Sequence, residues 1–288
     1  MKLCIFNMNR IGIVLDANVA DVTAVFDDVL SGRWPFPRHD LVIAHFEVLR
    51  PRIEAALAQA PRLPLAQVRL ASPVANPGKI IGAPINYRDH IAEANADAQI
   101  NHGKNFTSLD KFGLFNKVNS ALIGCSEEVL IPLADRRTDH EVELAVIIGK
   151  KARAVSRENA MAHVFGYSIG LDMTVRGPEF PGFRKSADTF AVLGPWITTA
   201  DEIADPNALD MSIRVNGELR QEANTRDLIF NVQRLIEYAS AMYTLHPGDV
   251  IMTGTPAGVG PVQPGDVMLA QIEGIGTMTV NIARSEPS

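Results

Sequence analysis

The sequence predicts a mixed, β-rich α/β protein that carries a small α+β domain at its N-terminus. From residue 80 onward the chain consists mainly of short Val- and Ile-rich runs separated by Gly, Pro, Asp and Asn, which is typical of strands and turns. Helical spacing is confined to a few segments. A Pro-rich stretch at residues 72–79 separates this strand-rich part of the sequence from the part that precedes it. We therefore predict domains at residues 1–78 and 79–288.

The first domain is predicted to contain a hairpin and two helices. "RIGIVLDANVADV", residues 10–22, has two apolar runs around a polar turn, which favours a β-hairpin. "DVTAVFDDVLSG", residues 21–32, has helical spacing that ends at a glycine. A longer helix is expected within residues 40–60, between two Pro-rich segments.

The second domain is predicted to be mostly strands with two covering helices. The strand candidates are "KIIGAPINY", "VELAVIIG", "SIRVNGEL", "DVIMTG" and "GTMTVNIA". The first helix is expected over residues 156–166, where Ser156 would be the N-cap and Glu158 would lie in the first turn. The second is expected over residues 225–242.

Composition restricts the class of partner. The 288 residues include 27 Lys and Arg against 33 Asp and Glu, a formal net charge of −6. This balance argues against a nucleic-acid surface and does not favour an anionic membrane, so a small-molecule substrate is expected. The two cysteines, Cys4 and Cys125, do not form a disulfide framework, and we expect reduced thiols. With neither a signal peptide nor a membrane-spanning run recognised, the predicted location is cytoplasmic.

A pair of acidic residues interrupts the apolar segment "TDHEVELAVIIGK". Side chains two apart on a strand share a face, so Glu141 and Glu143 would repel each other in a dry interior unless a cation lay between them. Asp172 lies in a similar apolar setting, 29 residues after Glu143. Three carboxylates suit Mg²⁺ or Mn²⁺ and leave coordination positions for a chelating substrate. On spacing alone, an exposed pair and a turn-capping Asp172 remain the alternative.

A histidine and a glutamate share one face of a predicted helix after Tyr87. His90 and Glu93 are three residues apart, and a carboxylate beside an imidazole raises its basicity and orients it. The pair is therefore a candidate for activating water, although a solvated surface pair has the same spacing. Residues 92–112, rich in Ala, Asn, Gly and Lys, are predicted to form a lid.

Several segments taken in order resemble the fumarylacetoacetate hydrolase family over residues 79–283. They include "GAPINYRDHIAE", "LFNKVNSALIG", "TDHEVELAVIIGKKARAV", "GYSIGLDMTVR", "RKSADTFAVLGPW" and "LHPGDVIMTGTPAGVGPV". The order of many motifs makes this resemblance far more specific than any one of them. It implies a β-roll catalytic domain, a homodimer, and Mg²⁺ or Mn²⁺ at the mouth of the roll.

The resemblance also implies roles for individual residues. Glu141, Glu143 and Asp172 would be the metal ligands, in a three-ligand form of the site, and His90, Glu93 and Lys185 would be catalytic. The expected substrate-binding residues are Tyr87, Lys117, Arg176, Gln221 and Thr255.

Family members act on 2-oxo acids and their β-diketo relatives. The His90 and Glu93 pair favours hydrolysis, so we expect a Mg- or Mn-dependent hydrolase that cleaves a C–C bond of an acylpyruvate such as fumarylpyruvate through a metal-bound enolate, as in aromatic catabolism. The alternative is an isomerase or decarboxylase on the same scaffold, of the 2-hydroxyhepta-2,4-diene-1,7-dioate isomerase or oxaloacetate decarboxylase type. A metal-binding scaffold without activity is the remaining class.

Overall fold

The N-terminal part of the chain forms an antiparallel sheet with one long helix. The computed structural model describes residues 1–32 and 34–285. The predicted hairpin is confirmed by the second and third strands, and Asp40 caps the long helix by accepting a hydrogen bond from Ile43 N at 3.0 Å. The elements are β1 (Lys2–Phe6), β2 (Arg10–Leu15), β3 (Asn18–Asp21), the 3₁₀ helix η1 (Thr23–Phe26), α1 (Asp27–Leu30), α2 (Leu41–Ala56), β4 (Arg62–Pro64), η2 (Leu65–Gln67) and β5 (Leu70–Ala71).

This N-terminal sheet continues into the rest of the molecule. Strand β1 pairs antiparallel with β14 (Ala191–Thr199), where Leu3 lies opposite Ile197. The sheet then runs in the order β4-β3-β2-β1-β14-β12-β11-β17-β6-β7. The added strands are β12 (Val164–Asp172), β11 (Val142–Ile148), β17 (Val250–Met252), β6 (Ile80–Gly82) and β7 (Phe115–Lys117). The predicted domain boundary, residue 78, lies between β5 and β6. The hydrogen bonds between β1 and β14 nevertheless join the parts of the chain on either side of it.

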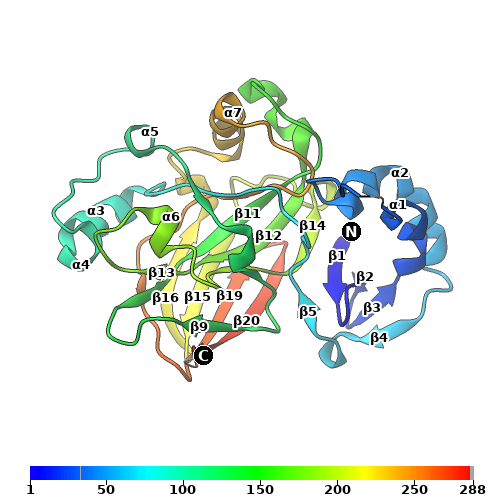
Figure 1. Cartoon of the computed structure of the whole chain (residues 1–288), viewed down its shortest axis with the longest axis horizontal. Coiled ribbons are helices and arrows are strands. Elements are labelled where there is room, and N and C mark those ends of the chain that lie inside the picture. The colour runs from blue at the N-terminus through cyan, green and yellow to red at the C-terminus, as the bar shows by residue number, and fades with distance from the viewer. Residues whose placement is uncertain (33, 286–288) are drawn as a thin grey trace.

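A second sheet faces this one and closes a roll around an apolar core. Its five strands are β16 (Glu218–Asn224), β15 (Asp210–Val215), β19 (Val267–Ile272), β20 (Gly276–Arg284) and β9 (Glu128–Ile131). A third, small sheet joins β13 (Thr174–Val175), β10 (Thr138–His140) and β18 (Gly260–Pro261). Leu144 and Ile169 of the long sheet belong to the same buried cluster as Ile213 and Ala270 of the second sheet. Figure 1 shows the roll beside the N-terminal sheet.

Short helices and turns cover one end of the roll. In Figure 1, α3, α4 and α6 lie on the side of the roll away from the N-terminal sheet, and α5 lies above them. Among the described residues no helix has the length and apolar character needed to cross a bilayer. The remaining elements are α3 (Arg88–Ala96), α4 (Ala98–Asn101), α5 (Leu109–Phe112), η3 (Asn119–Ala121), β8 (Leu122–Ile123), α6 (Pro181–Arg184) and η5 (Ala200–Glu202).

The helix expected over residues 225–242 is interrupted. A 3₁₀ turn, η6 (Thr225–Asp227), is separated from α7 (Val232–Met242) by the non-helical residues 228–231. In that segment Ile229 N donates to Asn86 O at 2.9 Å, and Phe230 N donates to Asn86 Oδ1 at 2.8 Å. The single-helix prediction is wrong because these long-range hydrogen bonds replace intrahelical ones.

The helix expected over residues 156–166 is also different. Residues 157–163 form a 3₁₀ helix, η4 (Arg157–His163), and Val164 already begins β12, where it pairs with Ile148. Ser156 does not cap this helix through its side chain; instead Asn159 Nδ2 donates to Ser156 Oγ at 3.2 Å. Strand pairing at Val164 therefore ends the helical segment earlier than its spacing predicts.

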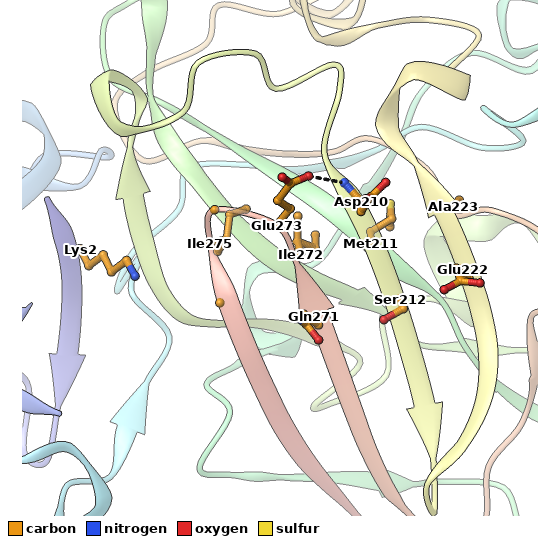
Figure 2. A pocket seen from close by; sticks show the side chains of 12 residues that line it. Lys2, Asp210, Met211, Ser212, Glu222, Ala223, Gln271, Ile272, Glu273 and Ile275 are labelled. Carbon is orange, nitrogen blue, oxygen red and sulfur yellow. Dashed lines mark hydrogen bonds between the residues drawn. The ribbon is translucent and has the colours of Figure 1, made fainter. Parts of the chain in front are cut away.

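An open hollow of about 700 Å³ separates the start of β1 from the second sheet. Lys2 reaches toward it from one side, and Asp210, Glu222 and Glu273 lie on the other (Figure 2). Asp210 N donates to Glu273 Oε2 at 3.2 Å, and these three acidic side chains are exposed. Because its charges are solvated, this hollow is a less suitable site for chemistry than the smaller cavity described next.

Candidate metal centre and active site

Three buried carboxylates meet where the chain passes from the small sheet into the long one. Glu141 follows β10 directly, Glu143 lies in β11, and Asp172 ends β12. Strands β11 and β12 are antiparallel, and Asp172 N donates to Glu141 O at 2.9 Å, which sets the two strand ends side by side. One carboxylate oxygen from each residue lies within 4.8 Å of the others. We call these residues the acidic trio, and their convergence agrees with the expectation from the sequence.

Two lysines hold two members of the acidic trio, Glu141 and Asp172. Lys185 Nζ donates to Glu141 Oε2 at 2.5 Å, to Asp172 Oδ2 at 2.7 Å and to Thr174 Oγ1 at 2.8 Å. Lys117 Nζ donates to Asp172 Oδ1 at 2.5 Å and to the carbonyl oxygen of Lys185. Burial lowers the pKa of Lys117, while the charge of Asp172 acts in the opposite direction. The ammonium groups thus offset part of the negative charge of the trio.

An arginine completes this network on the other side of Glu141. Arg176 Nη2 donates to Glu141 Oε1 at 2.9 Å, and Arg176 Nε donates to Asp139 Oδ2 at 2.7 Å. Burial alone would raise the pKa of Glu141, but the charges of Lys185 and Arg176 outweigh it and hold that pKa well below its usual range. Glu141 is therefore ionised in the folded protein.

Glu143 is in the opposite situation. Burial raises its pKa well above the usual range, and repulsion from Asp172 and Glu141 raises it further. Its Oε2 accepts a hydrogen bond from Gly254 N at 2.7 Å. A divalent cation between the three carboxylates would remove this repulsion, and an all-oxygen ligand set suits Mg²⁺ or Mn²⁺. The donor set therefore fits the metal that the sequence led us to expect.

The histidine and glutamate of α3 form the expected pair. His90 Nδ1 and Glu93 Oε2 lie 2.9 Å apart, and His90 is 5% exposed. Glu93 is fixed in turn, because its Oε1 accepts a hydrogen bond from Gly258 N at 2.9 Å. With Nδ1 held by a carboxylate, Nε2 is the ring nitrogen that remains for proton transfer.

The trio and His90 line one cavity of about 390 Å³, and Glu93 holds His90 without lining the cavity itself. Its apolar wall comes from the predicted lid and from the segment before α6, and the rings of Phe106 and Phe112 lie 5.4 Å apart. The predicted site residues that line it are His90, Glu141, Glu143, Asp172, Arg176, Lys185 and Thr255.

All five expected substrate-binding side chains bond to protein groups, Lys117 and Arg176 through the ion pairs described above. Gln221 Nε2 donates to Thr255 Oγ1 at 2.8 Å, and Thr255 Oγ1 donates to Val142 O at 3.0 Å. The hydroxyl of Tyr87 contacts Met211 Sδ at 3.4 Å. Among the predicted site residues, Tyr87, Glu93, Lys117 and Gln221 do not line the cavity. Contact of Tyr87, Lys117 and Gln221 with the substrate stays a prediction.

Sequence reasoning missed Arg184. This residue ends α6, lines the cavity, and has two guanidinium nitrogens, Nε and Nη1, that are buried without a hydrogen-bond partner among the described residues. The only signal in the sequence is its position next to Lys185. A basic residue in a short polar segment has no pattern that distinguishes it from a surface arginine.

A β-roll whose cavity is lined by a buried acidic trio and by a histidine held by a glutamate defines a metal-dependent enzyme. The family model described as fumarylacetoacetate (FAA) hydrolase, C-terminal, matches residues 79–283. The chain belongs to this family, and the resemblance recognised in the sequence is confirmed, as is the expected β-roll fold.

Two of the similar proteins are hydrolases that match almost the whole chain. Maleylpyruvate hydrolase of Aquipseudomonas alcaligenes is 57% identical over 98% of this chain and 99% of its own length. The crystal structure of maleylpyruvate hydrolase from Sphingobium sp. SYK-6, in complex with manganese(II) and pyruvate, superposes with a TM-score of 0.86 at 44% identity, covering 99% of this chain and all of that one. A more distant relative, the rat mitochondrial oxaloacetate tautomerase Fahd2a, is 36% identical over 78% of this chain and 72% of its own length.

Proposed function

We propose that this protein is a divalent-metal-dependent hydrolase that cleaves the C–C bond between the acyl group and the pyruvate unit of an acylpyruvate, a 2,4-dioxo acid of the maleylpyruvate or fumarylpyruvate type. The single observation that carries the proposal is the cavity that the acidic trio lines together with His90, whose Nδ1 is held by Glu93. The two maleylpyruvate hydrolases that match nearly the whole chain support it.

The acidic trio would hold the cation. A bound Mg²⁺ or Mn²⁺ supplies Lewis acidity toward the 2-oxo acid end of the substrate. Glu141 and Asp172 are oriented for this role by Lys185, and Glu143 is oriented by Gly254 N. The ammonium of Lys185 adds positive charge beside the same oxygens, which favours the enolate that develops during cleavage.

The His90–Glu93 pair would supply the base. His90 accepts a proton from water while the water oxygen bonds to the carbonyl carbon farther from the carboxylate, and Glu93 stabilises the resulting imidazolium. The bond between that carbon and the methylene carbon then breaks, and its electron pair passes to the pyruvate enolate. His90 returns its proton to the methylene carbon, so that the products are pyruvate and a carboxylic acid.

Isomerisation and decarboxylation are the alternative reactions on this scaffold. Neither reaction needs an attacking water. The buried His90 is held by Glu93, which is itself anchored to Gly258 N, and this arrangement suits a base that activates water. The relatives named as hydrolases match the chain at 57% and 44% identity, and the tautomerase matches it at 36%. Both observations favour hydrolysis.

The proposal is tested by product analysis with Mn²⁺ and with Mg²⁺. Maleylpyruvate or fumarylpyruvate should yield equal amounts of pyruvate and the dicarboxylic acid. Carbon dioxide from oxaloacetate, or an isomer without pyruvate release, would instead support the alternatives.

His90→Ala should reduce kcat by about 100-fold or more because the base is lost, while Mn²⁺ affinity by calorimetry stays within a few-fold of the parent. His163→Ala is the matched control, because His163 lies near Lys150, outside the cavity lining. If His90→Ala hydrolyses the substrate at the parental rate, His90 is not the base that activates water.

We also propose that the protein is a homodimer and acts in the cytoplasm. Exposed apolar side chains on the second sheet, Leu219, Val267 and Leu269, each 39% exposed, are compatible with a subunit contact. Both cysteines are free thiols, as expected of a reducing compartment. Light scattering would give the oligomeric state, and cell fractionation would give the location.

A further inference from the structure

Arg184 is half-buried, and two of its guanidinium nitrogens are buried without a hydrogen-bond partner among the described residues. Its Nε and Nη1 lie in the cavity wall and have no hydrogen-bond acceptor among the described residues. Burial lowers the pKa of Arg184, and the neighbouring charge of Arg176 lowers it further. A guanidinium remains protonated even so, and leaving its donors unpaired away from water is costly. Such a group is therefore expected to meet an anion from outside the chain.

The nearby carboxylates are already bonded to other cations. Glu141, Asp172 and Glu179 are the acidic residues whose charge acts on Arg184. Glu141 binds Arg176 at 2.9 Å and Lys185 at 2.5 Å. The unpaired donors of Arg184 thus remain available although acidic residues lie nearby.

The other two carboxylates are bonded in the same way. Asp172 binds both Lys117 and Lys185, at 2.5 and 2.7 Å. Glu179 is held by both terminal nitrogens of Arg136, at 2.9 and 2.8 Å. An incoming anion would therefore find Arg184 free to donate.

The proposed substrate has a position for such an anion. Its 2-oxo acid end would lie at the acidic trio, and phenylalanines that line the same cavity, Phe106, Phe112 and Phe180, suit the short carbon chain beyond it. A second carboxylate at the far end of that chain matches the fork of donors on a guanidinium. We propose that Arg184 binds the distal carboxylate of a dicarboxylic acylpyruvate and thereby selects diacid over monoacid substrates. This inference rests on the proposed function.

The test compares one diacid with one monoacid. The parent protein, Arg184→Met and Arg184→Lys are assayed with maleylpyruvate and with acetylpyruvate, which has no distal carboxylate. Arg184→Met should lower kcat/KM for maleylpyruvate by about 10- to 100-fold, mainly through KM, as expected when a charge-assisted hydrogen bond is lost. The kcat/KM of the same variant for acetylpyruvate should stay within about threefold of the parental value. Arg184→Lys should restore part of the loss, because it keeps the charge.

Arg157→Met is the matched control. Its guanidinium is paired with Glu237 outside the cavity lining, so it should leave the ratio between the two substrates unchanged. If kcat/KM of Arg184→Met falls equally for both substrates, Arg184 acts at the shared 2-oxo acid end or has a structural role. If kcat/KM falls for neither substrate, Arg184 does not contribute to substrate binding. Either result overturns the inference.

A binding measurement separates this inference from the proposed function. Calorimetry with the Mn²⁺-loaded protein compares maleate, whose two carboxylates are separated by a carbon–carbon double bond, with oxalate, whose adjacent carboxylates probe the metal end alone. Arg184→Met should weaken maleate binding at least about 10-fold and leave oxalate binding unchanged. Equal maleate affinity in parent and variant would overturn the role of Arg184, even if the parent hydrolyses acylpyruvates. If the parent hydrolyses no acylpyruvate, the proposed function fails separately.

Discussion

At the scale of single residues, Glu143 is the member of the acidic trio with no cationic partner among the described residues. It bonds to Gly254 N, whereas Glu141 and Asp172 are paired with lysines. Glu143→Gln should therefore weaken Mn²⁺ binding at least about 100-fold by calorimetry and abolish turnover, because a charged ligand is lost.

The same substitution should leave the melting temperature of the metal-free protein unchanged or higher, since it removes a buried, repelled carboxylate. Glu222→Gln, on the exposed face of β16, is the control for a surface carboxylate. Parental Mn²⁺ affinity in Glu143→Gln would show that the cation is held elsewhere.

A second residue-scale prediction concerns acid stability. Hydrogen bonds from Arg136 lower the pKa of Glu179 to about 2, against an ordinary value of 4.5. A carboxyl whose pKa falls on folding stabilises the folded state when ionised, so this contribution is complete above about pH 4.5 and is lost as pH falls toward 2.

Urea unfolding should therefore show a difference in midpoint between the parent and Glu179→Gln that is constant from pH 7 to 5 and shrinks at pH 4 and 3. A difference that stays constant down to pH 3 would mean that the ion pair does not contribute to stability.

What the sequence could predict at this scale depended on local pattern. Glu141 and Glu143 interrupt an otherwise apolar run, and that conflict with burial is visible without a structure. Arg184 breaks no pattern, because its burial results from the surrounding fold and not from its sequence neighbours. The same holds for Gln221, whose contacts to Thr255 and Val142 join residues far apart in the chain.

At the scale of elements, α3 is tied to the segment that precedes β18 through one glycine. Gly258 has φ +96°, and a side chain there would overlap the carbonyl oxygen of Arg220. Gly258→Ala should shift this segment and loosen the bond from Gly258 N to Glu93, which would misorient His90. We expect kcat to fall about 10-fold or more while Mn²⁺ affinity stays near the parental value.

A matched control for this substitution is Gly265→Ala. Gly265 also has a positive φ, +97°, but a side chain there would meet no atom within 4 Å and the residue lies outside the cavity lining. It should share the backbone strain and keep parental turnover. Equal loss of kcat in both variants would point to general destabilisation.

Strands recognised from their own composition were well predicted, whereas helices predicted from spacing were not where their residues bond to distant partners. The strands containing Val142, Val250 and Gly276 follow from their composition. The break before α7 does not, since it exists because Ile229 and Phe230 bond to Asn86, more than a hundred residues earlier. Helical spacing continues through that segment in the sequence and gives no warning of it.

At the scale of the whole molecule, the N-terminal helix packs on the long sheet. Phe46 of α2 meets Phe165 of β12 edge to face, with ring centroids 5.0 Å apart, inside a buried cluster that draws on both parts of the chain. Phe46→Ala should lower the free energy of unfolding by about 3–5 kcal/mol and keep a single cooperative transition, measured by calorimetry and urea unfolding.

Val48→Ala serves as the control because Val48, on the same helix, is 78% exposed; its effect should lie within about 0.5 kcal/mol. Two separate transitions in the Phe46 variant would show that the two parts unfold independently.

The division at residue 78 was predicted from composition, which reports where the chain changes character. Composition carries no information about which strands will be neighbours, so the pairing of Leu3 with Ile197 could not be foreseen. Whether residues 1–78 form a separate domain stays a prediction, although the shared sheet and shared core favour joint folding.

The pairing between β1 and β14 also limits how relatives of this protein can diverge. Any replacement N-terminal module must offer a strand in the same register, because otherwise the end of β14 near Ile197 becomes a bare sheet edge. Such an edge recruits strands from other molecules, which leads to aggregation. Recombination within the family would therefore be expected to exchange loops and helices in this module more readily than its first strand.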